Sequence, residues 1–143
     1  MTKPKLRIVN DKPTHYTVGA IIEKDNKYLL IDRALPPYGW AGIAGHIGDD
    51  ENPDDAIIRK VLEESNLDVI NRYLLLEEII PWNTCRDDID QHHWFLYNCL
   101  TEGKVNPNPD GIKSFQWAFK EEISKLNLEP VWDYLFRKLN IIF

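Results

Sequence analysis

The sequence predicts one α/β domain with a mixed sheet, and three observations lead to that prediction. The chain has 143 residues, 43% of them hydrophobic and 28% charged, which is the size and balance of one globular domain with a real core. Segments rich in β-branched and aromatic residues flank a helical pattern over residues 53–65, and a second helical pattern ends the chain. Because no repeat or linker interrupts it, we expect residues 1–143 to form a single domain.

The first expected element is a β-hairpin over residues 15–33. It reads HYTVGAIIEKDNKYLLIDR, with two β-rich runs on either side of the polar KDNK turn. Residues 34–53 follow as an expected irregular loop, because Pro36, Pro37 and Pro53 resist regular pairing and the glycines allow left-handed backbone. Long ordered loops of this kind are often functional.

The central helix is expected to begin after Asn52 and to end at Ser65. Asn52 is a good N-cap, Pro53 suits the first turn, and Asn66 can adopt the left-handed conformation that closes a helix. At 100° per residue, one apolar stripe should pack on the sheet, formed by Ile57, Ile58, Val61 and Leu62. The opposite face is expected to hold Arg59, Lys60, Glu63 and Glu64.

The rest of the chain is expected to continue the sheet and to close with helices. A polar loop over residues 81–90 separates two strands, and a turn over residues 106–111 precedes a third. The expected strands cover residues 69–80, 91–100 and 113–119, and the expected helices cover 120–126 and 129–139.

Charge and hydropathy exclude several classes of function. The net charge of −6 argues against binding a nucleic-acid polymer, because phosphate contacts need clustered Lys and Arg. No apolar run approaches the ~20 residues that cross a bilayer, and the first residues lack the apolar stretch of a signal peptide. We therefore expect a cytoplasmic protein without a membrane partner.

Cysteines and histidines give no clear site from spacing alone. Cys85 and Cys99 form no disulfide framework and lie in no metal-type cluster, so idle or buried thiols are expected. His92 and His93 are neighbours on an expected strand and should point to opposite faces, so one of them could face a site as a general base but the pair makes no metal site. His46 receives no role.

The segment from Gly45 to Leu67 resembles the Nudix box. That pattern has Gly, five variable residues, Glu, seven variable residues, and then Arg-Glu-apolar-any-Glu-Glu-any-Gly-apolar. Two specified positions depart from it, Lys60 and Asn66. The matching residues are Gly45, Glu51, Arg59, Val61, Glu63, Glu64 and Leu67. The order of strands, box helix and terminal helix is also similar to a Nudix domain, which implies an α/β/α sandwich.

The resemblance implies an enzyme that hydrolyses a diphosphate bond in a nucleoside diphosphate linked to another moiety, with Mg²⁺ or Mn²⁺ as cofactor. Hard cations take oxygen ligands and bridge phosphate oxygens, so carboxylates on one helical face suit this chemistry. By resemblance, Glu64 is the main metal ligand, Glu63 is a second ligand or a partner for bound water, and the carbonyl of Gly45 or Ala44 completes the site. Glu51 and Arg59 resemble the family's structural pair.

Lys60 departs from the box because the family places a glutamate there. The lysine brings a cation into a cluster that otherwise holds only carboxylates and should weaken Mg²⁺ binding. Three outcomes follow: the ammonium contacts phosphate as a point charge, acids from elsewhere rebuild the site, or only binding is kept. The acids considered for the second outcome are Glu77, Glu78, Asp87, Asp88, Asp90 and Asp110.

Several residues near the box are candidates for binding the substrate. Tyr38, Trp40 and Trp82 could stack on a base or ring, although aromatics beside a sheet more often belong to the core or its rim. Arg33 and Arg86 could bind phosphate oxygens through their forked guanidinium groups or pair with surface acids.

The preferred hypothesis is thus a Nudix-type pyrophosphohydrolase in which Lys60, Glu63 and Glu64 are catalytic and the partner is a small diphosphate or nucleotide. The main alternative is a Nudix-fold binding module for nucleotide, RNA or protein, whose chemistry Lys60 has disabled. A scaffold protein is a third hypothesis. Many Nudix domains dimerise, so the resemblance also allows a homodimer.

Overall fold

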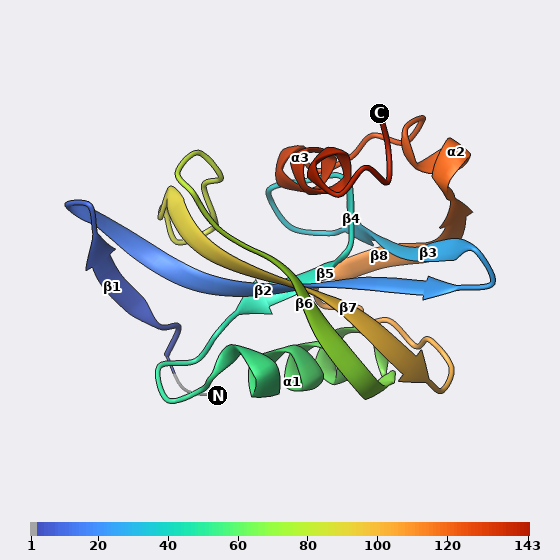
Figure 1. Ribbon diagram of the computed structural model, residues 1–143, viewed down its shortest axis with the longest axis horizontal. Coiled ribbons are helices and arrows are strands. Elements are labelled where there is room, and N and C mark those ends of the chain that lie inside the picture. Colours follow the sequence, from blue (N-terminus) through green and yellow to red (C-terminus); the bar gives the residue numbers. More distant parts are fainter. Residues whose placement is uncertain (1–2) are drawn as a thin grey trace.

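The chain folds into a mixed β-sheet with helices on both faces, as Figure 1 shows. The computed structural model describes residues 3–143. The helices are α1 (Pro53–Ser65), α2 (Lys120–Ile123) and α3 (Pro130–Lys138). The strands are β1 (Leu6–Val9), β2 (Lys12–Lys24), β3 (Lys27–Arg33), β4 (Trp40–Ala41), β5 (Ile43–His46), β6 (Asp68–Ile80), β7 (Gln91–Glu102) and β8 (Ile112–Phe119).

Strand pairing makes the sheet mixed. The central path runs β4-β3-β2-β7-β6, while β1 and β5 pair with β2 and β8 pairs with β3. Strands β2 and β7 are parallel, and the other pairs are antiparallel. The long strand β2 therefore pairs with several strands. In its middle part, β5 lies along one edge and β7 along the other.

The core has two halves, one on each face of the sheet. Side chains alternate along a strand, so Ile21 packs in the cluster that includes residues of α3, whereas Ala20 and Ile22 pack in the cluster that includes residues of α1. In Figure 1, α1 lies on one side of the sheet and α2 and α3 on the other. This arrangement confirms the expected α/β/α sandwich with a mixed sheet.

The boundaries of α1 are confirmed, but its buried face is not the expected one. The side chain of Asn52 accepts a hydrogen bond from the backbone N–H of Asp55 at 2.9 Å, and Asn66 has a φ of 65°. Leu62 was expected in the buried stripe but is 47% exposed. The residues of α1 that are buried are Ala56, Ile57, Val61 and Ser65.

This shift of the buried face changes the place of two box residues. At 100° per residue, Lys60 lies only about 60° and Glu64 about 20° around the helix from the buried Ile57. Their side chains are accordingly 17% and 20% exposed. The expectation that both lie on the outer face was wrong, because counting Leu62 as core displaced the stripe.

The segment over residues 34–53 is only partly irregular. It contains β4 and β5, and β5 pairs with β2 so that Gly45 lies opposite Val18. The N-terminal strand β1 was also not expected. Both errors have one cause: strands of two to four residues are too short to show a clear alternation in the sequence, and they form because the neighbouring strand offers its hydrogen bonds.

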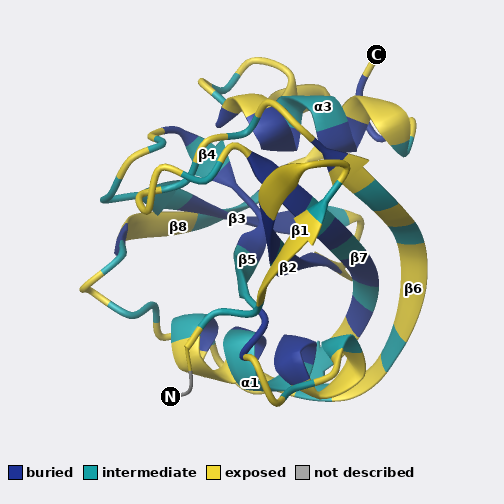
Figure 2. Cartoon of the chain, turned by 90° about the vertical axis from the view of Figure 1, so that its left-hand side faces the viewer, coloured by how far each residue is buried: buried dark blue, intermediate teal, exposed yellow. Residues whose placement is uncertain are grey.

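Strand β6 forms one end of the central path, and its residues are mostly exposed, as the colouring of Figure 2 shows. Its large apolar side chains Ile70, Tyr73 and Leu74 are all more than half exposed. A homodimer stays a prediction. Within residues 3–143, no helix combines the length and apolarity needed to cross a bilayer.

Candidate functional site

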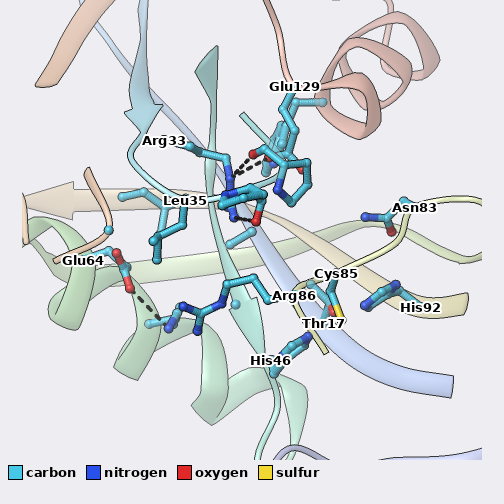
Figure 3. Close-up of a pocket in the computed structure, with 18 of the residues that line it drawn as sticks. Thr17, Arg33, Leu35, His46, Glu64, Asn83, Cys85, Arg86, His92 and Glu129 are labelled. Atoms are coloured by element: carbon cyan, nitrogen blue, oxygen red, sulfur yellow. Dashed lines mark hydrogen bonds and ion pairs between the residues drawn. The ribbon is translucent and has the colours of Figure 1, made fainter. Parts of the chain in front are cut away.

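A cavity of about 290 Å³ opens where the box helix, strands β2, β3, β5 and β7, and the loop between β6 and β7 come together. Figure 3 shows the side chains that surround it. Both apolar and polar groups form its wall, and the polar set combines cations, carboxylates and imidazoles. The polar and charged lining residues are Thr17, Arg33, His46, Lys60, Glu64, Asn83, Cys85, Arg86, Asp87, His92 and Glu129.

Glu51 and Arg59 join the loop before α1 to the helix. Arg59 donates from Nε to Glu51 Oε2 at 2.6 Å and from Nη2 to Glu51 Oε1 at 2.8 Å, and the same guanidinium donates to the His46 carbonyl at 3.1 Å. The backbone N–H of Gly48 also donates to Glu51, at 2.9 Å. These hydrogen bonds, the one from Arg59 above all, lower the pKa of Glu51, so its carboxylate stays charged.

Replacing Arg59 by lysine should therefore lower the free energy of unfolding by about 2 kcal/mol, because an ammonium cannot donate in a fork to Glu51 and also reach the carbonyl of His46. Urea denaturation measures this change. Arg137→Lys is the matched control, since Arg137 pairs with Asp133 on the surface and both side chains are more than 40% exposed; this control should lose less than about 0.5 kcal/mol. Equal losses in both variants would contradict a structural role for the Glu51–Arg59 pair.

Lys60 lies inside the site rather than in solvent. Its Nζ atom is 3.2 Å from Glu64 Oε1 and 3.7 Å from Glu63 Oε2. The lysine side chain also covers Gly45, where a Cβ would meet Lys60 Cε at 1.9 Å. Glycine at position 45 thus makes room for the lysine, and the three charged side chains Lys60, Glu63 and Glu64 carry a formal charge of −1 together.

The two box carboxylates have different surroundings. Glu64 lines the cavity, whereas Glu63 is not part of its lining, is 39% exposed and accepts a hydrogen bond from Arg59 at 2.9 Å. Two carboxylates with a cation between them do not make a closed oxygen cage. They do fit a Mg²⁺ ion that keeps several waters and takes further oxygens from a phosphate, which is the usual way this ion is held.

The expected phosphate-binding arginines both line the cavity. Arg33 donates from Nε to the carbonyl of Pro37 at 2.6 Å. In Figure 3, Arg86 extends from the loop that also carries Cys85 into the space in front of Glu64. With Lys60, these side chains give the cavity three cations.

The expected stacking aromatics lie outside the cavity wall. Tyr38 is 59% exposed and has Lys113 Nζ 5.7 Å from its ring centre. Trp40 packs against the core cluster of α3, and Trp82 makes an edge contact with Tyr134. A binding role for Tyr38 and Trp40 stays a prediction, and it would need the ligand to extend beyond the cavity.

Among the acids outside the box that were considered as metal ligands, Asp87 lines the cavity. Three others already have partners: Glu77 contacts His93 at 2.8 Å, Asp90 accepts from Thr84 at 2.7 Å, and Glu78 is bonded to Tyr134. Asp88 and Asp110 are exposed residues of the two loops and are not part of the wall. Of these acids, Asp87 is therefore the one positioned to face a ligand in the cavity.

Glu129 is a lining residue that sequence reasoning missed. It is only 4% exposed, and burial raises its pKa to about 7 even though the nearby Arg33 guanidinium opposes the shift. Its Oε1 atom lies 3.5 Å from Arg33 Nε but accepts no hydrogen bond of normal geometry within the described residues. The sequence offered no signal for it, because burial of a glutamate before a helix depends on tertiary packing.

The raised pKa of Glu129 predicts a pH-dependent stability. Between the ordinary pKa of 4.5 and the folded value of about 7, the folded state binds the proton more tightly, so the stability from this group is complete below pH 4.5 and is lost as the pH rises through 7. The wild type should lose about 3 kcal/mol of unfolding free energy across this window, and Glu129→Gln should not show that loss. Urea denaturation of both proteins from pH 4.5 to 8 measures it, and parallel stability curves would contradict the buried titration.

Three histidines and Cys85 come together beside the cavity; His46, Cys85 and His92 line it, so His92 is the member of the His92–His93 pair that faces a site. His15, His46, Cys85 and His92 bring one potential ligand atom each to within 4.8 Å of one another. The expectation that neither cysteine lies in a metal-type cluster was wrong for Cys85. His93, by contrast, faces away from the cluster and contacts Glu77. No spacing signal was available, since these residues come from four segments that only the fold unites.

Comparison with known proteins points to one family. The sequence model of the NUDIX domain matches residues 13–139. The chain is 31% identical to isopentenyl-diphosphate Delta-isomerase of Corynebacterium glutamicum, over 85% of this chain and 71% of that protein. It is 24% identical to the nucleoside triphosphatase NudI of Escherichia fergusonii, over 78% of this chain and 86% of that protein.

Solved structures show the same fold. The NUDIX domain of Shewanella oneidensis NrtR, determined in complex with ADP ribose, superposes with a TM-score of 0.72 at 16% identity, over 87% of this chain and 85% of that one. The solution structure of the E. coli ORF135 protein superposes with a TM-score of 0.68 at 19% identity, over 90% and 94% of the two chains.

Proposed function

The chain belongs to the Nudix superfamily, and on that premise we propose that it hydrolyses a diphosphate linkage in a small compound, such as a nucleoside diphosphate joined to another group. The observation that carries the proposal is the pair of Lys60 and Glu64 at the cavity wall, 3.2 Å apart beside Gly45. A cation and a carboxylate are thereby held together inside a concave site of a size suited to a small ligand.

The cations of the cavity would bind the diphosphate. Arg33, Lys60 and Arg86 all line it, and guanidinium and ammonium groups form strong charge-assisted hydrogen bonds with phosphate oxygens. We assign to Lys60 the contact nearest the bond that is cleaved, because it is fixed between the box carboxylates and Gly45. Its ammonium then stands where the family places a third carboxylate.

Glu64, with Glu63 and the carbonyl of Gly45 or Ala44, would hold Mg²⁺ or Mn²⁺. The ion, when bound, neutralises phosphate charge and makes a water more nucleophilic. In the reaction the water oxygen bonds to one phosphorus, the bridging P–O bond breaks, and the proton of the water is passed to a carboxylate or to solvent. The bridging oxygen leaves with the other phosphate.

The relatives support a phosphorylated ligand. The compounds in the names of these two relatives, an isopentenyl diphosphate and a nucleoside triphosphate, both contain a diphosphate unit. The group attached to that unit differs between them. The buried Glu129 lies beside Arg33 and away from Glu64 in Figure 3, where its carboxyl group could contact the attached group while Arg33 binds phosphate. The NudI relative favours hydrolysis over a pure binding role.

A substrate panel tests the proposal. Wild-type protein with Mg²⁺ or Mn²⁺ is incubated with nucleoside triphosphates, dinucleoside polyphosphates, sugar nucleotides, ADP ribose and isopentenyl diphosphate, and the products are separated by ion-exchange chromatography. We expect cleavage of at least one diphosphate bond, with one oxygen from H₂¹⁸O in a product phosphate. Rearrangement of isopentenyl diphosphate without such incorporation would contradict hydrolysis and identify an isomerase instead.

A further inference from the structure

We propose that His15, His46, Cys85 and His92 bind a second metal ion, Zn²⁺ or a divalent transition metal of similar softness, at a site separate from the box carboxylates. Three imidazole nitrogens and a thiolate suit such an ion and are poor ligands for Mg²⁺. This inference does not depend on the proposed hydrolysis. We define these residues as the His₃Cys site.

Strand register explains why the histidines meet. His15 on β2 lies directly opposite His92 on β7, so both side chains stand on the same face of the sheet. On the other edge of β2, His46 of β5 lies opposite Thr17, two residues from His15 and thus on that same face. Cys85 then reaches the three rings from the loop between β6 and β7, as Figure 3 shows for its place beside His46 and His92.

The distances suit a small contraction onto one ion. A tetrahedral ion with bonds of about 2.0–2.3 Å separates its ligand atoms by about 3.3–3.7 Å. Cys85 Sγ and His15 Nδ1 are already 3.7 Å apart, and no pair in the site exceeds 4.8 Å. Movements of about an ångström would bring the four ligand atoms from within 4.8 Å of one another to these separations.

Two buried polar atoms at this place have no partner. His92 is 2% exposed, and its Nδ1 forms no hydrogen bond of normal geometry within the described residues, although backbone groups of Asp90 and Asn83 lie close enough to the ring to oppose the lowering of its pKa by burial. Thr17 Oγ1 is likewise buried without a partner. Buried polar atoms are almost always satisfied, so an unpaired imidazole nitrogen in a cluster of ligand atoms indicates a missing partner.

Charged groups of both signs lie near the site. Asp87 comes from the same loop as Cys85 and adds negative charge to the cavity, whereas Lys60 of α1 adds positive charge. Metal ligands must be neutral imidazoles and a thiolate, so a bound ion would displace any protons that these groups carry.

A bound ion would have two effects. It would tie the loop over residues 81–90 to β2, β5 and β7, and it would add positive charge to the cavity that His46, Cys85 and His92 share with Lys60 and Glu64. With one thiolate and three neutral imidazoles, the charge of a divalent site is +1. This charge faces the space in which a phosphate would lie.

Co²⁺ alone is the test ion, because a thiolate ligand gives an intense charge-transfer band and four-coordination gives strong visible bands. Chelator-treated full-length protein is titrated with Co²⁺ in buffer without substrate. We expect saturation at one ion per chain, displacement by one equivalent of Zn²⁺, and no displacement by millimolar Mg²⁺. A linear, unsaturated response or the absence of a thiolate band would overturn the proposal.

Matched variants locate the ion. Cys85→Ser should abolish the charge-transfer band, and His92→Asn should weaken Zn²⁺ binding by at least about tenfold, since even outer-shell changes cost that much. Three variants serve as controls. Cys99→Ala removes the other thiol, and His93→Asn removes the imidazole on the opposite face of β7. Glu64→Gln changes the box. All three should keep the band; its loss in Glu64→Gln would place the ion in the box instead.

A measurement on the wild type covers the case in which a variant fails to fold. X-ray absorption at the zinc edge of the protein with one equivalent of Zn²⁺ should show three nitrogen neighbours and one sulfur neighbour at about 2.0 and 2.3 Å. A shell of oxygens without sulfur would overturn the His₃Cys site.

Discussion

Replacing Glu64 by glutamine is expected to lower kcat/KM for diphosphate hydrolysis by about 10²–10³-fold, a change of about 3–4 kcal/mol in transition-state stabilisation. Glu64 is the box carboxylate that lines the cavity, and its Oε1 is 3.2 Å from Lys60 Nζ. The amide has nearly the same size but no charge, so it holds a hard divalent cation poorly and leaves the ammonium without its partner. Steady-state kinetics on the best compound of the panel measures the effect.

Two further measurements make this result specific. In the wild type, millimolar Mg²⁺ or Mn²⁺ should raise the melting temperature through linkage, and Glu64→Gln should lose that gain. Glu77→Gln is the matched control, because its carboxylate contacts His93 outside the cavity; it should keep activity within about twofold. A fully active Glu64→Gln enzyme would contradict the assignment of the ion to the box.

Removing the charge of Lys60 is the second change with a large expected effect. Lys60→Met keeps the aliphatic stem that covers Gly45 but deletes the ammonium. If the ammonium contacts phosphate, kcat/KM should fall by about 10–100-fold, the size expected from one charge-assisted contact. A larger fall in kcat than rise in KM would indicate that the contact strengthens in the transition state.

Lys60→Glu provides the complementary change. It alters the formal charge of residues 60, 63 and 64 from −1 to −3, so Mg²⁺ should bind more tightly, which isothermal titration without substrate measures. The activity need not follow the affinity, because the phosphate would lose its cation. An unchanged Mg²⁺ affinity would contradict the proposed place of the ion beside Lys60.

The box shows how far sequence spacing reaches. The spacing of the box implied that Glu51 and Arg59 would contact each other. In the structure, Arg59 donates two hydrogen bonds to Glu51 and so joins the loop to the helix. Asn52 and Asn66 are the two caps of α1, as predicted, because helix caps depend on local backbone chemistry. Features that depend on a few neighbouring residues were therefore open to prediction.

Features that depend on the register of distant strands were not. His15 and His92 face each other only because β2 and β7 pair in parallel, and the sequence does not show which strands are neighbours. The place of Lys60 was also missed, since an error of one residue in the apolar stripe moves a side chain by 100° around the helix. Burial of Glu129 depends on how α3 packs and left no local signal.

Product release by wild type and Lys60→Glu on the same panel of diphosphates, with Mg²⁺ or Mn²⁺ present, tests most directly whether Lys60 belongs to a working site. We expect the wild type to cleave at least one compound and Lys60→Glu to be no faster on it. A silent wild type beside an active Lys60→Glu would contradict this expectation, and would show a fold that still positions a diphosphate but whose lysine has replaced catalysis by binding.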